Sequence, residues 1–382
     1  MNEGVTRRSF LQASLAGLGL AAVDAVQFLD AGSNAWAESA PLARARESLK
    51  TMILKHAAAK DNPWLLLHGI RAIGKGFKVD GEPALGYVCA RYLKETRVNG
   101  KAYLYFPPGD EGHTNAFLSE AILDAGVAAD YPIRWNGRRY AIGDLVASAK
   151  ARFSFDPASF DGDDVAWSLI TFAYITPPDE DTWVNAYGKR IRFSEVVEFG
   201  MATLEEATQQ LRTAMRQGMM STQKDRIHDF TCGGTHLIYG LATCLRFGYR
   251  QRSFADRMKT QFDLLVWRLE ADPHLIDTHY RLAVGQHPED AVRLHHLDAK
   301  LKFLGHAFEV INYARLYRLF SPTAAQEKTL ASSQAALVSV IDGIGREGIG
   351  KFARDTRLLR LLVGDACHAY HGLKMVKGVN QG

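Results

Sequence analysis

From residue 38 onward, hydrophobic positions recur with a helical period, and the helical segments come in pairs. The first helix of each pair is amphipathic and rich in charge: 43–60, 84–95, 142–152, 195–217, 254–270 and 324–344. The second is apolar around most of its girth: 63–76, 113–125, 164–174, 234–247, 301–320 and 360–376. An apolar helix must be covered on all sides. We therefore predict an all-α fold in which six solvated helices surround six buried ones.

This alternation of helices resembles an (α/α)6 toroid, in which the second helix of each hairpin belongs to an inner ring. The resemblance implies a single α/α-toroid domain over residues 38–382. Polar aromatic residues recur where the inner helices are expected to start: His68, His113, Trp167, His236, His306 and His368. In a closed ring these starts meet at one end. An open α-solenoid and an irregular helical bundle are the alternatives.

Small β-hairpins are expected between some of the helices. Asn99-Gly100 and Asn136-Gly137 each lie between short β-prone runs, and residues 183–190 have a similar pattern. Asn-Gly favours the primed turns of two-residue hairpins, because both central residues need a positive φ. We expect these hairpins to decorate one end of the ring, either as plain connections or as part of a binding surface.

The first residues of the chain resemble a twin-arginine (Tat) export signal. Thr-Arg-Arg-Ser-Phe-Leu-Gln occupies residues 6–12, an Ala/Gly-rich apolar run spans 13–23, and Ala-Trp-Ala at 35–37 suits signal peptidase. The resemblance implies a bacterial protein exported by the Tat machinery to the periplasm or beyond. Residues 1–37 would be the signal peptide, and the mature chain would begin near Glu38. Retention of the segment as a membrane anchor is the alternative.

Composition narrows the classes of function. Hydrophobic residues make up 47% and charged residues 23%, and the formal net charge is +4. The excess of basic residues is small and scattered, so we expect no nucleic-acid partner. No stretch of the mature chain reaches the length of a transmembrane helix, so no membrane span is expected there. The four cysteines are too few for a disulfide scaffold in a chain of this length.

Two segments carry candidate metal ligands. Residues 228–236 contain Cys232 and His236, and residues 365–372 contain Cys367 and His368. Zinc prefers four ligands drawn from thiolate, imidazole and carboxylate, and a catalytic zinc keeps one position for water. We predict that these four residues hold a zinc ion. A disulfide between Cys232 and Cys367, or unreactive packing of both segments, are the alternatives; Cys89 and Cys244 are expected in the core.

The Cys-His pair at 367–368, with Gly372 nearby, resembles the zinc-binding segments of lanthionine-synthetase-like toroids. Zinc-bearing prenyltransferase toroids are similar in drawing Asp, Cys and His from separate inner-helix ends. Both resemblances imply a metal site at the inner-helix N-termini.

Acid–base candidates accompany the predicted metal site. His306 and Glu309 are three residues apart on one helix face, which suits a general acid/base oriented by a carboxylate. His113 and Asp229 are further catalytic candidates, and Asp229 or His306 are possible replacements for a metal ligand. The candidate substrate-binding residues are Trp64, His68, Trp167 and His371.

These residues predict an exported toroid enzyme, with zinc as cofactor and a small molecule or oligosaccharide as substrate. A zinc-dependent hydrolase or transferase is the leading hypothesis. The alternatives are a metal-free carbohydrate-active enzyme, namely a polysaccharide lyase, glycoside hydrolase or epimerase, and a non-catalytic envelope protein that binds or matures a partner. The sequence contains no G-x-S-x-G elbow, H-E-x-x-H motif or phosphate-binding loop.

Overall fold

The computed structural model describes residues 39–375 except residues 163, 221–222 and 252. The described residues belong to one compact unit, and the expected export signal lies outside them. This unit is mostly helical, with small two-stranded sheets at its periphery, which confirms the all-α prediction. No helix within the described residues has both the length and the apolar character needed to cross a bilayer.

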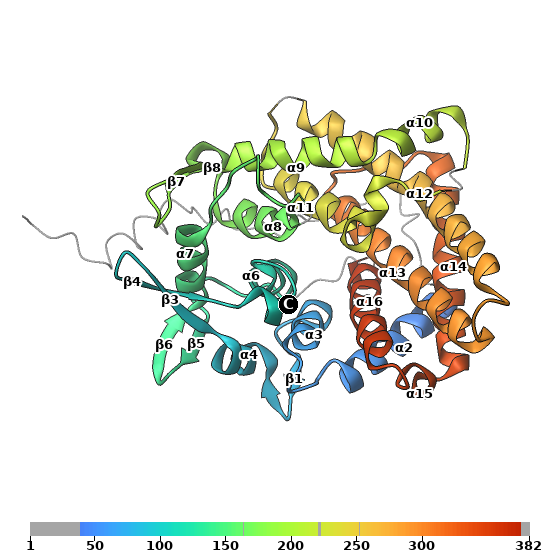
Figure 1. Cartoon of the computed structure of the whole chain (residues 1–382), viewed down its shortest axis with the longest axis horizontal. Helices are drawn as coiled ribbons and strands as arrows, with labels where there is room; N and C mark the ends of the chain where they lie inside the picture. Colours follow the sequence, from blue (N-terminus) through green and yellow to red (C-terminus); the bar gives the residue numbers. More distant parts are fainter. Residues whose placement is uncertain (1–38, 163, 221–222, 252, 376–382) are drawn as a thin grey trace, which may run out of the picture. The chain divides into compact units, whose positions relative to one another are not determined.

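Six buried segments contact one another in turn (Figure 1). They are α3 (Pro63–Ile73), the short α6 (Ala116–Leu118) continued by the π-helical η1 (Ser119–Asp124), α8 (Val165–Ile175), α11 (Thr235–Arg246), α13 (Glu289–Leu316) and α16 (Thr356–Met375). The last of them, α16, packs against the first, α3, so the series of contacts returns to its start. Helix α8 is buried from Val165 to Ala173, as expected of a helix that is apolar around its girth.

The more polar helices cover this series from outside. They are α2 (Ala40–His56), α4 (Ala84–Tyr92), α7 (Ile142–Arg152), α9 (Phe193–Ala207), α12 (Phe254–Ala283) and α14 (Ala324–Glu347). Helix α9 packs on α8 and α11, α12 packs on α11 and α13, and α2 packs on α16 and α3. Capping residues stabilise the beginning of several of these helices. At the start of α14, for example, Thr323 and Gln326 form a reciprocal capping box.

Shorter elements connect the helices. The helical ones are α5 (Pro108–Glu111), η2 (Pro178–Glu180), α10 (Gln209–Gln217), η3 (Arg226–Asp229), η4 (Thr231–Gly234) and α15 (Ile349–Phe352). The antiparallel hairpins are β1 (Lys78–Val79) with β2 (Glu82–Pro83), β3 (Lys94–Val98) with β4 (Lys101–Tyr105), β5 (Pro132–Trp135) with β6 (Arg138–Ala141), and β7 (Thr182–Val184) with β8 (Arg190–Arg192). The three hairpins predicted from the sequence are confirmed. At Asn99-Gly100, φ is 49° and 77°, as a primed turn requires.

Helices α12 and α13 are longer than the sequence predicts. We expected α12 to end at residue 270 and α13 to begin near 301, because the intervening residues are polar. Instead both helices extend into this region and pair there through side chains. Asp277 Oδ1 lies 2.6 Å from both His296 Nε2 and Lys300 Nζ, and the rings of Tyr280 and His296 stack with centroids 4.3 Å apart. Polar cross-helix contacts therefore hold these extensions, which hydrophobic periodicity does not reveal.

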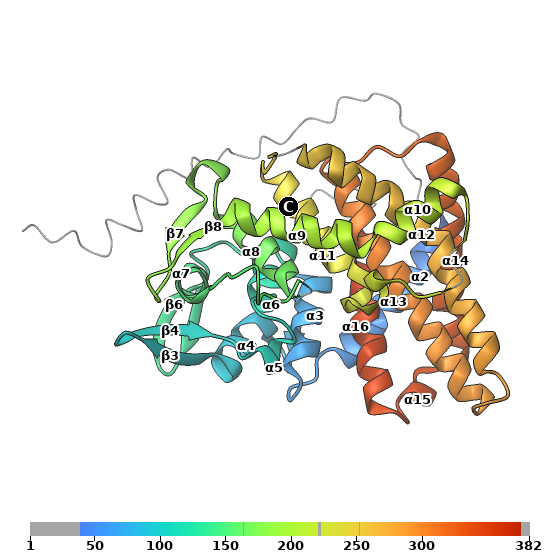
Figure 2. The same ribbon diagram turned by 45° about the horizontal axis from the view of Figure 1, so that its top comes forward.

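Helices α13 and α16 lie side by side at very short range, as Figures 1 and 2 both show. A Cβ atom added to Gly305 would lie 2.9 Å from Cβ of Ala369, and one added to Gly372 would lie 2.7 Å from the backbone of Glu309. Only glycine fits at such positions. The two glycines therefore allow the backbone approach that brings Glu309 against α16.

This packing corrects the expected position of two histidines. His306 lies in the middle of α13 and His368 in the middle of α16, not at helix N-termini. Gly305 suggested a helix start, but its role is close helix packing. The prediction that inner-helix N-termini converge around these imidazoles is therefore wrong for both helices, although His236 does lie in the first turn of α11.

Candidate functional site

A cavity of about 330 Å³ opens among the six buried segments. Its walls come from α3, α5 and the loop after it, α6 and η1, α8, η4, α11, α13 and α16. The residues that line it are Trp64, His68, Arg71, Glu111, Gly112, His113, Ala116, Glu120, Trp167, Thr231, Cys232, His236, Lys302, His306, Arg357, Arg360, Leu361, Asp365 and His368. The structure thus brings His236, His306 and His368 into one cavity, despite their separation in the sequence.

Three of the lining residues form a group able to hold a metal ion. The ligand atoms of Cys232, His236 and His306 all lie within 4.8 Å of one another. In a tetrahedral zinc site the ligand atoms are roughly 3.3–3.7 Å apart, so small side-chain rotations close the group around an ion. Of the four ligands predicted from the sequence, two belong to the group, and His306 joins them in place of Cys367 and His368.

Hydrogen bonds at Nδ1 set the orientation of three imidazoles in the cavity. Nδ1 of His68 lies 2.7 Å from the carbonyl oxygen of Trp64, and Nδ1 of His306 lies 2.7 Å from that of Lys302. Nδ1 of His368 lies 2.8 Å from Glu309 Oε2. Each Nδ1 therefore carries the proton and donates it, and each Nε2 keeps its lone pair. The buried Nε2 of His306 has no partner among the described residues, which is the state of an imidazole ready to bind a metal.

An unusual backbone turn presents Cys232. Cys232, Gly233 and Gly234 all have positive φ, at 52°, 64° and 74°. A Cβ on Gly234 would lie 2.3 Å from Ile227, so the position requires glycine. Arg268 donates to the carbonyl oxygen of Gly233 at 2.9 Å and holds the turn. A left-handed conformation costs a non-glycine residue about 1–2 kcal/mol, and such strain is often found at functional sites.

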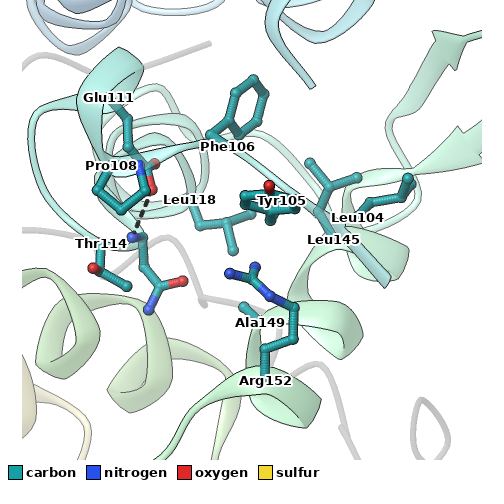
Figure 3. Close-up of a pocket in the computed structure, with 11 residues that line it drawn as sticks. Leu104, Tyr105, Phe106, Pro108, Glu111, Thr114, Leu118, Leu145, Ala149 and Arg152 are labelled. Carbon is teal, nitrogen blue, oxygen red and sulfur yellow. Dashed lines mark hydrogen bonds between the residues drawn. The ribbon is translucent and has the colours of Figure 1, made fainter. Parts of the chain in front are cut away.

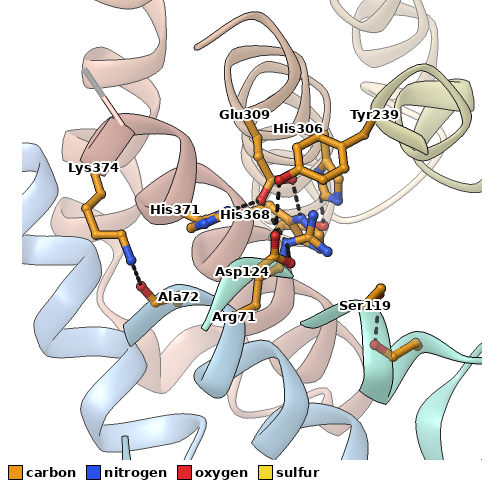
Figure 4. Close-up of polar contacts among 12 residues, drawn as sticks. Arg71, Ala72, Ser119, Asp124, Tyr239, His306, Glu309, His368, His371 and Lys374 are labelled. Carbon is orange, nitrogen blue, oxygen red and sulfur yellow. Dashed lines mark hydrogen bonds and ion pairs between the residues drawn. The ribbon is translucent and has the colours of Figure 1, made fainter. Parts of the chain in front are cut away.

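Behind the cavity wall, Glu309 is the centre of a buried polar network (Figure 4). Its carboxylate accepts hydrogen bonds from Nε of Arg71 at 2.8 Å, Nδ1 of His368 at 2.8 Å and Nδ1 of His371 at 2.7 Å. The Arg71 guanidinium and the imidazole donors hold the pKa of Glu309 well below its usual range, despite burial. The carboxylate predicted to orient His306 therefore orients His368 and His371 instead.

Four of the histidines that line the cavity, namely His68, His236, His306 and His368, are buried and neutral. Burial lowers the pKa of both His68 and His306 to about 3. Burial, together with the neighbouring imidazoles, lowers the pKa of His236 and His368 well below the ordinary value. Desolvation disfavours the imidazolium form of each. Neutral imidazoles have the lone pairs that metal binding and proton acceptance require.

The carboxyl groups that line the cavity have raised pKa values. Burial raises the pKa of Glu120 and Asp365 well above the ordinary range, and raises that of Glu111 to about 8. Basic residues line the same cavity: Arg71 deep inside, Lys302 on α13, and the exposed Arg357 and Arg360 in the first turns of α16. The cavity is therefore electropositive near neutral pH.

The two predicted tryptophans line the cavity, but other side chains cover their rings. The His113 ring stacks on Trp167 with centroids 3.6 Å apart. Trp64 packs against His68 at 3.8 Å, and the guanidinium of Arg360 lies 4.7 Å from its ring centroid. The two tryptophans therefore line the cavity and support the polar side chains that pack on their rings.

Four of the sequence-predicted site residues lie outside the cavity lining, and Glu309, described above, is one of them. Asp229 is exposed on η3. Cys367 and His371 are buried on α16, and His371 bonds to Glu309 behind the wall. All four cysteines are described and none forms a disulfide, so the proposed Cys232–Cys367 bridge is wrong. Burial raises the pKa of the Cys367 thiol well above its ordinary value, so this side chain is a core residue.

A second, smaller cavity of about 80 Å³ lies between β4, α5 and α7 (Figure 3). Glu111 lines both cavities, and its carboxylate accepts hydrogen bonds from the backbone N–H groups of Asn115 and Phe117 at 3.0 and 2.9 Å. Glu111 therefore caps the beginning of α6 and lies between the two cavities. On the far side, the guanidinium of Arg152 lies 4.3 Å from the ring centroid of Tyr105.

Arg71 is a site residue that was not predicted from the sequence. It is fully buried in the apolar helix α3. Charged residues are almost never fully buried unless they are paired, so a lone arginine within the run 63–73 was a usable signal.

Comparison with protein-family models, with curated proteins and with solved structures found no match to this chain.

Proposed function

We propose that this chain is an exported, zinc-dependent hydrolase built on an (α/α)6 toroid, with Cys232, His236 and His306 as the zinc ligands. The observation that carries the proposal is the convergence of these three ligand atoms on a cavity of about 330 Å³. The toroid is supported by the closed series of contacts from α3 through α16 and back to α3.

The donor set favours zinc. One thiolate and two imidazoles are common zinc ligands, and three protein ligands leave the fourth position for water, as in catalytic sites. A Cys/His₂ set also suits copper when a methionine lies on its axis. The lining of this cavity, all of it within the described residues, includes no methionine.

His368 is suited to act as the general base. Its Nδ1 proton is held by Glu309, its Nε2 retains a lone pair, and its ring stacks 3.8 Å from the ring of His306. Arg71 keeps Glu309 ionised, and the carboxylate partly offsets the burial that lowers the pKa of His368, so that the imidazole can accept a proton in the reaction. Zinc at such sites lowers the pKa of water and polarises carbonyl or phosphoryl oxygens.

The cavity favours a small-molecule substrate over an oligosaccharide. Its volume is at the lower end of the range for small-molecule sites, about 300–1,000 Å³. Sugar recognition by stacking needs exposed aromatic faces, and the rings of Trp64 and Trp167 are covered by His68 and His113. A metal-free carbohydrate-active enzyme is therefore our second hypothesis, and a non-catalytic envelope protein is the third.

Metal analysis of the purified protein tests the proposal. We expect about one zinc per chain in the wild type, loss of the metal in Cys232→Ala and His306→Ala, and retention in the control Cys367→Ala. Zinc-dependent turnover should then appear on a panel of esters, amides and phosphoesters. A wild type without metal that degrades oligosaccharides would instead support the carbohydrate reading.

Export rests on the residue pattern of the first 37 positions. Recognition of paired arginines depends on guanidinium geometry. A double variant Arg7→Lys, Arg8→Lys should therefore accumulate in the cytoplasm, and its normal appearance in the periplasmic fraction would remove the export assignment.

A further inference from the structure

Arg71 has hydrogen-bonding capacity that the protein leaves unused. Its side chain is fully buried, and its Nε donates to Glu309 at 2.8 Å. The two terminal nitrogens, Nη1 and Nη2, have no hydrogen-bond partner among the described residues. Arg71 also lines the cavity. Oδ2 of Asp124 also lies 3.4 Å from Nε, so the contacts drawn in Figure 4 pair the charge of Arg71 but leave both terminal amino groups unsatisfied.

Unsatisfied buried donors of this kind are costly, at roughly 1–3 kcal/mol each and more for charged groups. A protein recovers that cost when a ligand supplies the acceptors. The two terminal amino groups of a guanidinium match the oxygens of a carboxylate or a phosphate in a bidentate arrangement. Because Glu309 occupies Nε, the orientation of the fork is fixed before any ligand enters.

We propose that the terminal amino groups of Arg71 bind a carboxylate or phosphate group of the substrate within the cavity. The enzyme would thus act on a small anionic molecule. This inference rests on the proposed function for calling the bound molecule a substrate, whereas the anion site itself does not depend on the metal.

The charges around the cavity support an anionic ligand. Lys302, Arg357 and Arg360 line the same cavity as Arg71. Burial raises the pKa of Glu111 and Glu120 in the lining, so these two groups oppose the basic residues only weakly near neutral pH. Oε2 of Glu120 has no hydrogen-bond partner among the described residues, and in the protonated form it can donate a further hydrogen bond to the anion.

The position of Arg71 also suits the reaction. Glu309 bonds to both Arg71 and His368, and the ring of His368 lies 3.8 Å from that of His306. An anion on Arg71 would therefore share one cavity with the proposed base and with the metal ligands.

Thermal stabilisation by simple anions tests the site. Succinate and inorganic phosphate, compared with chloride at equal ionic strength, should raise the melting temperature of the wild type by binding the folded state. Arg71→Lys keeps the charge beside Glu309 but lacks the two terminal amino groups of the guanidinium. We expect its anion affinity to fall by roughly tenfold or more. Arg139→Gln, which removes an exposed charge on β6 outside the cavity lining, is the matched control and should retain the affinity. A preference between succinate and phosphate would distinguish the two anion types.

Three outcomes would overturn the proposal: no stabilisation of the wild type at tens of millimolar anion, undiminished binding by Arg71→Lys, or an equal loss in Arg139→Gln. If Arg71→Lys does not fold, wild-type crystals soaked in selenate give the answer. An anomalous selenium peak about 4 Å from both terminal nitrogens of Arg71, with selenate oxygens at hydrogen-bond distance, supports the site, and a peak only at Arg357 and Arg360, or none, contradicts it. Repeating the assay with EDTA separates the two hypotheses, since anion binding should survive metal removal even if the zinc proposal fails.

Discussion

The carboxylate of Glu309 accepts a hydrogen bond from Nδ1 of His368 at 2.8 Å, and both side chains are almost fully buried. Glu309 comes from α13 and His368 from α16, so the bond joins the two helices that pack most closely. The same carboxylate balances Arg71 from α3. One residue therefore links the packing of three helices to the orientation of the proposed base.

Replacing Glu309 should destabilise the fold strongly. Glu309→Gln removes the negative charge and leaves Arg71 without its closest counter-ion, and breaking a buried ion pair costs about 3–5 kcal/mol. Denaturant unfolding measures the loss. The control is Glu327→Gln, which breaks a partly exposed pair with Arg315 and should cost less than about 1 kcal/mol. Equal effects of the two variants would show that the buried network adds nothing beyond a surface pair.

Cys232→Gly should separate metal binding from stability. Glycine accepts the positive φ of this position, so relief of backbone strain of about 1–2 kcal/mol offsets the greater freedom of glycine in the unfolded chain. We expect the free energy of unfolding of the metal-free protein to be unchanged or slightly raised, and bound zinc to be lost. A large loss of stability without EDTA-sensitive metal in the wild type would identify the thiol as a structural group.

His68 should make stability depend on pH. Its pKa is about 3 in the folded protein against 6.5 in the unfolded chain, so below pH 6.5 the unfolded state binds the proton and folding is disfavoured. The contribution is complete above pH 6.5 and is lost as the pH falls toward 3. Between pH 7.5 and 5, the wild type should lose about 2 kcal/mol more than His68→Gln, measured in EDTA. Parallel pH profiles of the two proteins would contradict a buried, neutral His68.

Gly372 should tolerate no side chain. The added Cβ of Gly372→Ala would lie 2.7 Å from the backbone of Glu309, so α13 and α16 must move apart at a cost of about 1–3 kcal/mol. The displacement should also weaken metal-dependent activity through His368. Gly345→Ala in α14 meets no atom within 4 Å and should stabilise the fold by up to about 1 kcal/mol. A harmless Gly372→Ala would refute the close packing.

The helices and hairpins were accessible from the sequence because their signals are local. Hydrophobic periodicity located the buried and solvated helices, and Asn99-Gly100 and Asn136-Gly137 located two turns. The same local logic failed where a residue serves a distant partner. His306 was expected near a helix start, but Gly305 beside it faces Ala369 on another helix. Residues 271–300 lay between two predicted helices, yet both helices extend into them, where Asp277 makes cross-helix contacts.

The candidate site was predictable as a set of residue types but not as a set of contacts. Cys232, His236, His306 and His368 were all identified, yet their roles depend on side-chain direction. The bond from His306 to the carbonyl of Lys302 turns its Nε2 toward the metal group, while His368 is turned toward Glu309. The spacing of His306 and Glu309 suggested that they pair on one helix face. Spacing cannot reveal that α16 approaches that face and supplies His368 as the partner of Glu309.

X-ray absorption at the zinc edge of the zinc-loaded protein tests the central claim most directly. Binding by Cys232, His236 and His306 predicts one sulfur at about 2.3 Å and two imidazole nitrogens at about 2.0–2.1 Å, with a further oxygen ligand from solvent. The sulfur contribution should vanish in Cys232→Ser and persist in Cys367→Ser. Two sulfur ligands, or a shell of nitrogen and oxygen alone in the wild type, would contradict the proposed site.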